Sequence, residues 1–192
     1  MKINGYGGAN TNLSGKPFEE AVLMGFKPGQ TYLIGGKSFT YIPQDGFVKF
    51  MIDLKDTQWG HTKKPDGALV SEDRETVILI ECKHQIVAGS VDEKIRAGPC
   101  LLEEYRSLYP SVKNFFMMFI VNEWWFKQRK YEIPIRFNQA HGIPVFFARQ
   151  MGDKWKVHIQ KKTNKWTIYP ATYKVDEEEI MDWMTKQVLQ SS

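Results

Sequence analysis

The apolar run Thr76-Val77-Ile78-Leu79-Ile80 constrains the fold of this chain more than any other sequence feature. β-branched residues dominate it, and polar residues do not alternate with them as they do in a strand with one wet face. The run therefore predicts a strand that is buried on both faces and central in its sheet. A second strand is predicted at residues 67–71, and the polar turn at residues 72–75 would join the two strands as a hairpin.

The order of the remaining apolar runs predicts an α/β or α+β sheet with helices packed on it. Further strands are predicted over residues 47–54, 114–121 and 143–149. Helices are predicted over residues 18–25, over residues 91–108 with a break at Gly98-Pro99, and after residue 176. Asp176 can cap the last of these helices, whose first turn carries three glutamates.

Size and composition are those of an ordinary globular chain. A length of 192 residues is near that of one domain, so we expect a single domain over residues 1–192. Residues 1–14 are rich in Gly and Asn, which favours a flexible N-terminal arm. A formal net charge of +4 permits a polyanionic partner without requiring one.

Location and redox setting are inferred from features that the sequence lacks. Cys82 and Cys100 are too few for a disulfide framework, and their spacing does not suit a zinc site. No apolar run reaches the roughly 20 residues that span a membrane, and the N-terminus lacks the apolar stretch of a signal peptide. We therefore expect a cytoplasmic protein with reduced thiols and no membrane partner.

Three charged residues surround the end of the strand that contains this apolar run, predicted at residues 76–82. Glu81 and Lys83 are two residues apart, so their side chains leave the strand on the same face. Burying such charges is costly unless each is paired or bound to a metal. Asp66 opens the neighbouring strand, and hairpin pairing would bring its carboxylate close to that of Glu81. A hard divalent cation such as Mg²⁺ would relieve their repulsion, and two carboxylates with a lysine suit metal-assisted phosphodiester hydrolysis.

This arrangement resembles the PD-(D/E)xK nuclease superfamily: Pro65-Asp66, a gap of 14 residues, then Glu81-Cys82-Lys83. The resemblance covers residues 15–125. In addition, Gly89-Ser90-Val91-Asp92-Glu93-Lys94 resembles the segment that follows the catalytic strand in a group of type II restriction endonucleases. The superfamily implies a restriction-endonuclease-like core, in which a central mixed β-sheet is flanked by helices.

The resemblance also implies roles for the charged residues. Asp66 and Glu81 would ligate Mg²⁺, with Mn²⁺ as a substitute, and the Cys82 carbonyl would be a further ligand. Lys83 would act on the attacking water. These assignments predict a deoxyribonuclease, a phosphodiester hydrolase.

A supporting acid on an N-terminal helix is implied in the same way. Gly15-Lys16-Pro17-Phe18-Glu19 resembles the start of that helix in several members of the superfamily. Glu19 is therefore the expected acid, and Glu20 is the alternative. Gln85, two residues beyond the lysine, is expected to line the site.

Nucleic-acid contacts are expected from basic residues around these segments. Trp124-Trp125-Phe126 is expected to be mainly structural, with the basic run that follows it on the DNA. The basic stretch at residues 154–165 fits an exposed sheet face on the DNA and a solvated edge equally well. The residues expected to contact DNA are Lys63, Lys64, Ser90, Lys94, Lys127, Arg129 and Lys130.

Three functional hypotheses follow. The first is a sequence-specific type II restriction endonuclease that cuts double-stranded DNA to 5′-phosphate and 3′-hydroxyl ends. We expect it to act as a homodimer, because each chain carries one catalytic set while a palindromic duplex presents two strands. The second hypothesis keeps the chemistry but assigns a repair, junction-resolving or homing substrate. The third is an inactive DNA-binding module, against which the intact Asp66, Glu81 and Lys83 argue.

Overall fold

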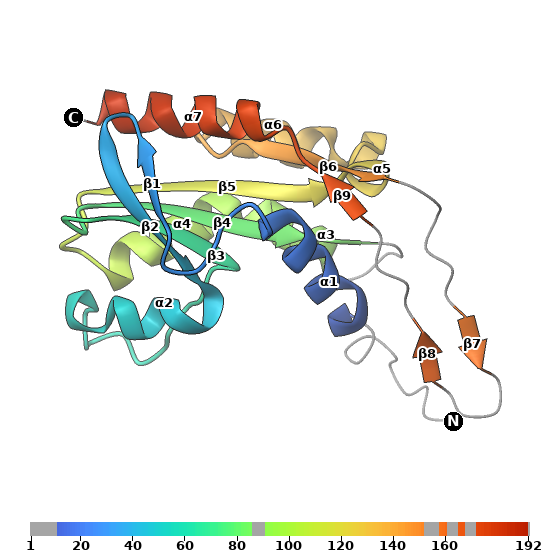
Figure 1. Cartoon of the computed structure of the whole chain (residues 1–192), viewed down its shortest axis with the longest axis horizontal. Helices are drawn as coiled ribbons and strands as arrows, with labels where there is room; N and C mark the ends of the chain where they lie inside the picture. Colours follow the sequence, from blue (N-terminus) through green and yellow to red (C-terminus); the bar gives the residue numbers. More distant parts are fainter. Residues whose placement is uncertain (1–10, 86–90, 152–157, 161–164, 168–171, 192) are drawn as a thin grey trace.

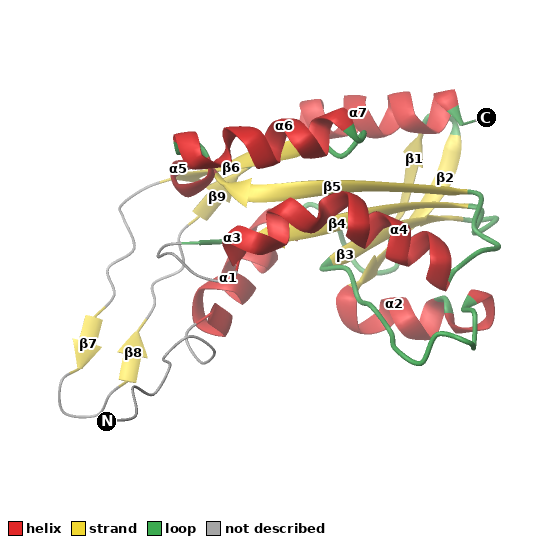
Figure 2. Cartoon of the chain, turned by 180° about the vertical axis from the view of Figure 1, so that it is seen from behind, coloured by secondary structure: helices red, strands yellow, loops and turns green. Residues whose placement is uncertain are grey.

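A mixed seven-stranded sheet forms the centre of the structure, with helices on both of its faces (Figures 1 and 2). This computed structural model describes residues 11–85, 91–151, 158–160, 165–167 and 172–191. The order in the sheet is β1 (Thr31–Ile34), β2 (Lys37–Pro43), β3 (Gly67–Ser71), β4 (Thr76–Lys83), β5 (Asn114–Asn122), β6 (Val145–Met151) and β9 (Thr172–Lys174). A separate ribbon pairs β7 (His158–Gln160) with β8 (Lys165–Thr167).

Two hydrophobic cores fix the helices to the sheet. On one face lie α1 (Thr11–Leu23) and α7 (Glu177–Gln190). On the other lie α2 (Gln44–Phe50), α4 (Gly98–Leu108) and α6 (Glu132–Ala140). The shorter helical segments are η1 (Ile52–Leu54), α3 (Val91–Lys94), η2 (Ile95–Ala97), α5 (Glu123–Phe126) and η3 (Arg129–Tyr131). None of the helices in the described ranges is both long and apolar enough to cross a membrane.

Strand β4 is the fourth of the seven strands and has the two-sided burial that its sequence predicts. Val77 and Leu79 enter the core beneath α4, whereas Ile78 and Ile80 enter the core beneath α1 and α7. All four side chains are fully buried. β4 pairs antiparallel with β3 and parallel with β5, which makes it the strand at which the sheet changes direction. The fold class is therefore α/β, as predicted.

The strand predicted at residues 47–54 is wrong, because these residues lie in α2 and η1. A short apolar run suits a buried strand and a buried helix equally. Phe47 and Met51 are four residues apart and both fully buried, which is the spacing of one helical face. Pro43 precedes the helix in an extended conformation, as suits the residue before a first turn.

The other predicted elements agree with the structure, with shifts at their ends. The predicted break at Gly98-Pro99 separates η2 from α4, and Asp176 caps α7 by accepting a hydrogen bond from Glu179 N–H at 3.1 Å. α1 already begins at Thr11, inside the arm expected over residues 1–14, and residues 1–10 lie outside the described part.

The hairpin of β1 and β2 and the edge strand β9 were not predicted. The β1–β2 turn consists of Gly35 and Gly36, both of which have positive φ. Paired glycines between two apolar runs are a hairpin signal, because type I′ turns need positive φ at both central residues. That signal was present in the sequence, whereas the three residues of β9 are too few to show a pattern.

Candidate active site

Asp66, Glu81 and Lys83 meet at the edge of the sheet where β3 begins and β4 ends (Figure 1). The antiparallel register pairs Gly67 with Ile80, so Asp66 and Glu81 occupy the next positions along the hairpin. Because Asp66 directly precedes β3 and Glu81 lies within β4, their backbone positions are set by the most buried part of the fold. The convergence expected from the sequence pattern is present.

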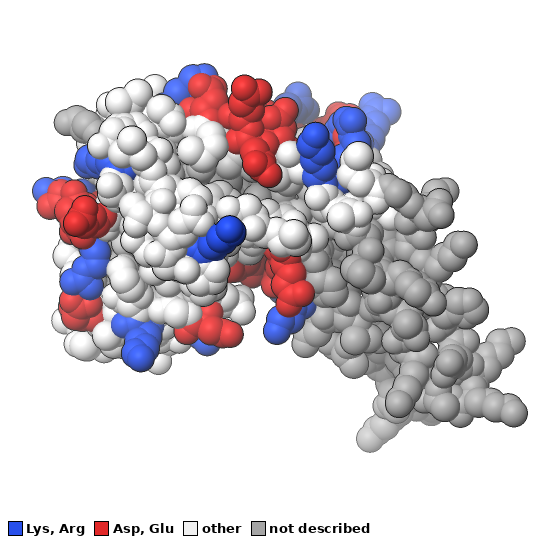
Figure 3. Space-filling model, in the orientation of Figure 1, with Lys and Arg blue, Asp and Glu red and all other residues white. Residues whose placement is uncertain are grey.

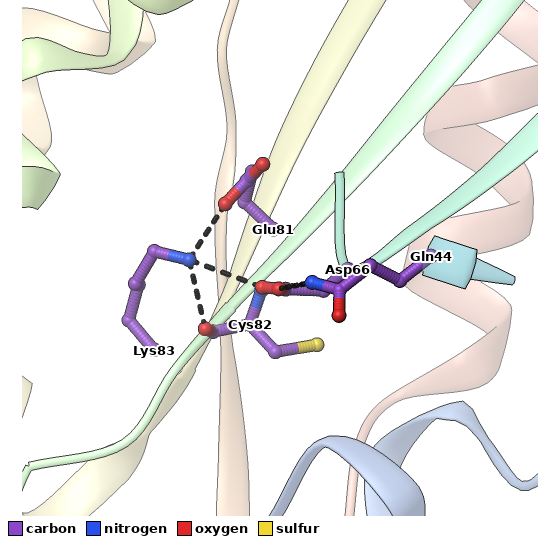
Figure 4. A network of polar contacts seen from close by, with 5 residues as sticks. All are labelled: Gln44, Asp66, Glu81, Cys82 and Lys83. Carbon is purple, nitrogen blue, oxygen red and sulfur yellow. Dashed lines mark hydrogen bonds and ion pairs between the residues drawn. The ribbon is translucent and has the colours of Figure 1, made fainter. Parts of the chain in front are cut away.

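The Lys83 ammonium lies among three oxygen atoms (Figure 4). Nζ is 2.6 Å from Glu81 Oε2, 3.0 Å from Asp66 Oδ2 and 3.0 Å from the carbonyl oxygen of Cys82. The side chains of Lys83, Asp66 and Glu81 are 13%, 12% and 8% exposed. Two carboxylates and one carbonyl therefore point at a single, nearly dry position that already holds a positive charge.

Asp66 is fixed by contacts at both carboxylate oxygens. Oδ2 accepts a hydrogen bond from the Cys82 N–H at 2.7 Å, in addition to the Lys83 contact. Oδ1 accepts one from Gln44 Nε2 at 3.3 Å, from the first residue of α2 (Figure 4). The carboxylate is thus oriented by β4 on one side and by α2 on the other.

The charged groups of this cluster shift one another's pKa values. Burial raises the pKa of Glu81, Lys83 opposes that rise, and the Asp66 carboxylate adds to it. Burial on its own would lower the pKa of Lys83, but Glu81 and Asp66 together raise it above its ordinary value. The lysine therefore stays charged, and the two carboxylates share one cation between them.

Glu19 on α1 belongs to the same electrostatic group. Burial chiefly, with Asp66 and Glu81 adding to it and Lys83 opposing them, raises its pKa to about 7. A carboxyl group responds in this way when it is partly buried and also faces other carboxylates. Phe18, the residue before it, is fully buried and anchors α1 to the sheet. The alternative acid, Glu20, is exposed and lines the same cavity.

These side chains open onto a cavity of about 770 Å³ between α1 and α2. Its lining includes Glu19, Tyr41, Gln44, Asp66, Lys83 and Lys94. Figure 3 shows acidic and basic side chains together at the hollow beside α1. A phosphate chain entering this cavity would reach Asp66 and Lys83 directly, while Glu81 lies deeper behind the lysine.

The donor set fits a hard divalent cation. Mg²⁺ prefers oxygen ligands and is bound in proteins by one or two carboxylates, with water and phosphate completing its shell. Asp66, Glu81 and the Cys82 carbonyl supply such oxygens, and all three converge on the position of the Lys83 ammonium. Among the described residues, no three His, Cys, Asp or Glu side chains gather into a metal site of their own. The backbone carbonyl and external ligands are therefore needed.

Gln85 lies behind the site rather than on the cavity wall. Its side chain is 6% exposed, and it is not among the residues that line the cavity. Its backbone is held by Asn122 at the end of β5, at both the N–H and the carbonyl. The Gln85 backbone thus belongs to the packing that supports the strand end.

Of the basic residues near the hairpin, two lie close to acidic side chains and one lines the cavity. Lys63 forms an ion pair with Glu104 on α4, and Lys64 lies 4.0 Å from Asp45, which borders the cavity. Lys94 lines the cavity and lowers the pKa of Glu81 by its charge. Ser90 lies outside the described residues.

The basic run after β5 lies at the sheet edge where the parallel strands end, away from the cavity lining. Lys127 pairs with Glu123 at 2.6 Å, and Lys130 lies 4.7 Å from the ring centres of Trp125 and Tyr131. Arg129 is exposed. Of the neighbouring aromatic residues, Phe126 is buried, Trp125 half-buried and Trp124 51% exposed. Of the basic stretch at residues 154–165, the structure describes residues 158–160 and 165.

Three residues at or behind the site were not predicted from the sequence: Tyr41, Gln44 and Asn122. Tyr41 and Gln44 come from the missed strand β2 and the misassigned helix α2. Asn122 ends the apolar run of β5, and a polar residue in that place is the one signal that could have singled it out.

The comparisons with known proteins agree with this geometry. The sequence model of a family described as "PD-(D/E)XK nuclease superfamily domain" matches residues 11–112, which is more than half of the chain and includes Glu19, Asp66, Glu81 and Lys83. No curated protein matches the chain, and no solved structure does. With a mixed sheet flanked by helices and with the matched segment carrying the hairpin site, the chain belongs to the PD-(D/E)XK nuclease superfamily.

Proposed function

We propose that this protein is a Mg²⁺-dependent endonuclease that hydrolyses phosphodiester bonds of double-stranded DNA. One observation carries the proposal: the oxygens of Asp66, Glu81 and Cys82 converge on the Lys83 ammonium at the wall of a cavity. Membership of a nuclease superfamily gives the reaction class. Mn²⁺ would substitute for Mg²⁺, because both accept the same oxygen donors.

The residues divide the chemistry among them. Asp66, Glu81 and the Cys82 carbonyl would hold the cation, which when bound polarises the phosphate and lowers the pKa of water. Lys83 keeps its charge in the site, so it can orient the attacking water and stabilise the negative charge that develops on the phosphate. Glu19 has a pKa of about 7 without a cation, which suits a group that exchanges a proton with that water.

The assignment to double-stranded DNA rests on the basic residues around the site. Lys94 lines the cavity and Lys64 lies beside Asp45 at its border, where they can contact phosphates next to the one that is cut. Lys127, Arg129 and Lys130 form a second basic group that would extend the contact along the duplex. Two strands must be cut by a chain with one such site, so we propose a homodimer with one single-domain protomer on each strand.

Within this class we propose a sequence-specific type II restriction endonuclease that leaves 5′-phosphate and 3′-hydroxyl ends. The resemblance of residues 89–94 to restriction endonucleases supports that choice over a repair, junction-resolving or homing enzyme. It is also the choice that predicts the simplest result, a fixed pattern of fragments from one DNA.

The test is incubation of the purified protein with plasmid, genomic and branched DNA in Mg²⁺ and in EDTA. Discrete fragments in Mg²⁺ alone support restriction, and cleavage of branched DNA alone would replace it with a junction-resolving role. Binding without any cleavage would make the protein an inactive module. Lys83→Ala, prepared in parallel, controls for contaminating nuclease, since its preparation must not cut.

A further inference from the structure

We propose that the Tyr41 hydroxyl binds the nucleic acid directly, by donating a hydrogen bond to a phosphate oxygen in the cavity beside Asp66. The inference rests on the proposed function and adds a substrate-binding group from β2. No pattern in the catalytic hairpin points to this residue.

The ring of Tyr41 is rigidly held at the cavity wall. Its side chain is 3% exposed, and its ring stacks on Phe26 with the centres 5.4 Å apart and an interplanar angle of 24°. It nevertheless lines the same cavity as Asp66 and Lys83. Only a small part of the residue is accessible, and that part faces the site.

The hydroxyl lies directly over Gly67, the residue after Asp66. A Cβ atom built on Gly67 would stand 2.8 Å from the Tyr41 oxygen and 2.9 Å from its ring. This close approach brings the hydroxyl beside the first residue of β3. The close approach of Tyr41 therefore accounts for a glycine at position 67.

Across the described ranges the structure records no hydrogen bond to the Tyr41 hydroxyl. This oxygen is not one of the fully buried, unpartnered side-chain atoms of the described residues, so it is accessible from the cavity that Tyr41 lines. A phenol O–H needs its surroundings to supply an acceptor. The side chains and backbone around Tyr41 do not supply one, which leaves the contents of the cavity as the source. Tyr32 on β1 shows the contrast, because its hydroxyl accepts from Lys27 N–H at 2.8 Å and donates to the Gly25 carbonyl at 3.2 Å.

The protonation state of Tyr41 suits an anionic partner. Burial, with smaller contributions from the nearby Cys82 and Asp66, raises its pKa to about 12. The phenol is therefore neutral at any pH at which a nuclease works, and it can only gain by donating its proton to an acceptor. A phosphate oxygen drawn in by Lys83 and Lys94 is such an acceptor.

The experiment compares Tyr41→Phe with Tyr109→Phe. Tyr109 is also fully buried, and its hydroxyl also has no hydrogen bond within the described part of the chain, but it lies in the core beneath α4 and not at the cavity. Each variant removes one oxygen and keeps the ring. The two proteins are compared in thermal unfolding, in single-turnover cleavage of a duplex in Mg²⁺, and in binding of the same duplex in Ca²⁺ by fluorescence anisotropy.

We expect both variants to unfold within a degree or two of wild type. Tyr41→Phe should cleave about 10-fold to 10²-fold more slowly, somewhat less than the loss of a full oxyanion donor, and bind the duplex more weakly. Tyr109→Phe should match wild type in both assays. A Tyr41→Phe protein that cleaves and binds like wild type, or that fails to fold, overturns the inference while leaving the proposed function standing.

Failure of the proposed function would look different. Wild-type protein that binds the duplex without cutting it would refute the nuclease, and the binding difference between the two variants would still decide the role of Tyr41. Wild-type protein that neither binds nor cuts refutes both.

Discussion

Asn122 hydrogen-bonds both backbone polar groups of Gln85. Its Oδ1 accepts from the Gln85 N–H at 2.9 Å, and its Nδ2 donates to the Gln85 carbonyl at 2.9 Å. The ladder between β4 and β5 ends at Lys83 and Val121, so the Asn122 amide takes the place of a peptide group and continues the pairing. The strand end that carries Lys83 is thereby held on the side facing β5.

Replacing Asn122 by alanine should destabilise the protein by about 2–3 kcal/mol, because two backbone groups of Gln85 lose their partners in a buried place. Cleavage should also slow, because the chain after Lys83 is no longer fixed. Urea unfolding and hydrogen exchange at the Gln85 amide measure the two effects. Asn114→Ala at the other end of β5 is the matched control and should cost less, since Asn114 makes a single 3.5 Å contact with Thr76.

The three charged residues of the hairpin should respond differently to neutralisation. Asp66→Asn and Glu81→Gln should each abolish Mg²⁺-dependent cleavage. Either change leaves Lys83 paired with the remaining carboxylate, so stability in EDTA should hold or rise. Lys83→Ala should slow cleavage by at least about 10²-fold and lower the melting temperature, because two buried carboxylates then face each other without a cation.

Cleavage of plasmid in Mg²⁺ and melting in EDTA test these expectations. Glu72→Gln, in the exposed turn between β3 and β4, is the control and should change neither. Near wild-type cleavage by folded Lys83→Ala or Asp66→Asn would remove those residues from the mechanism.

Glu19 should make the metal-free protein less stable as the pH rises from 4.5 to about 7. Its pKa is about 7 in the folded protein and 4.5 ordinarily, so over this range the folded state binds more protons than the unfolded state. Stability is greatest below the lower value and is lost as the pH passes the upper one. Urea unfolding in EDTA at a series of pH values should show this slope, and Glu19→Gln should flatten it. An identical slope in the variant would place the cause elsewhere.

His84 should make the protein less stable as the pH falls, which is the opposite of the effect expected from Glu19. Burial lowers its pKa from 6.5 to about 4, so the unfolded state binds more protons between those values and stability falls as the pH drops through them. The loss is on the order of 2–3 kcal/mol by pH 4. In the folded protein the ring contacts the Tyr173 hydroxyl at 2.9 Å and packs against Phe18. His84→Gln should remove this acid sensitivity in the same unfolding series; a variant as acid-sensitive as wild type would contradict the assignment.

Gly67→Ala should destabilise the protein by about 1–3 kcal/mol, because its Cβ would stand within 3 Å of the Tyr41 ring and hydroxyl. It should also slow cleavage, since Tyr41 must shift at the cavity wall. Gly60→Ala provides the control, for nothing lies within 4 Å of a Cβ there. Chemical unfolding of the two variants side by side gives the comparison, and equal stability would show that Tyr41 moves aside at no cost.

Local patterns predicted much of this fold because the sequence of the central strand clearly indicates a strand buried on both faces. The run at residues 76–80 shows by itself that both of its faces are buried, and the hairpin register then places Asp66 beside Glu81. The strand prediction at residues 47–54 was wrong because an apolar run of this length suits either a strand or a short helix. The packing that decided for the helix, with Phe47 against Tyr105 and Tyr109, comes from residues far along the chain.

The supporting residues of the site escaped prediction for the same reason. Tyr41 matters because β2 is hydrogen-bonded to β3, and Asn122 matters because β5 runs parallel to β4. The residues near those positions do not predict either strand pairing. Glu19 was predicted because the resemblance supplied a partner that its own helix does not reveal.

The hydrogen bond from the Cys82 N–H to Asp66 joins the rigid centre of the sheet to a carboxylate that lines the cavity. A backbone proton in the β4 strand therefore senses the state of that side chain. Protonation, a cation or a phosphate that draws Asp66 away would alter the chemical shift and solvent exchange of this single amide. Cys82 thus offers a built-in spectroscopic reporter, through which occupancy of the cavity can be followed without labelling the nucleic acid or waiting for a bond to break.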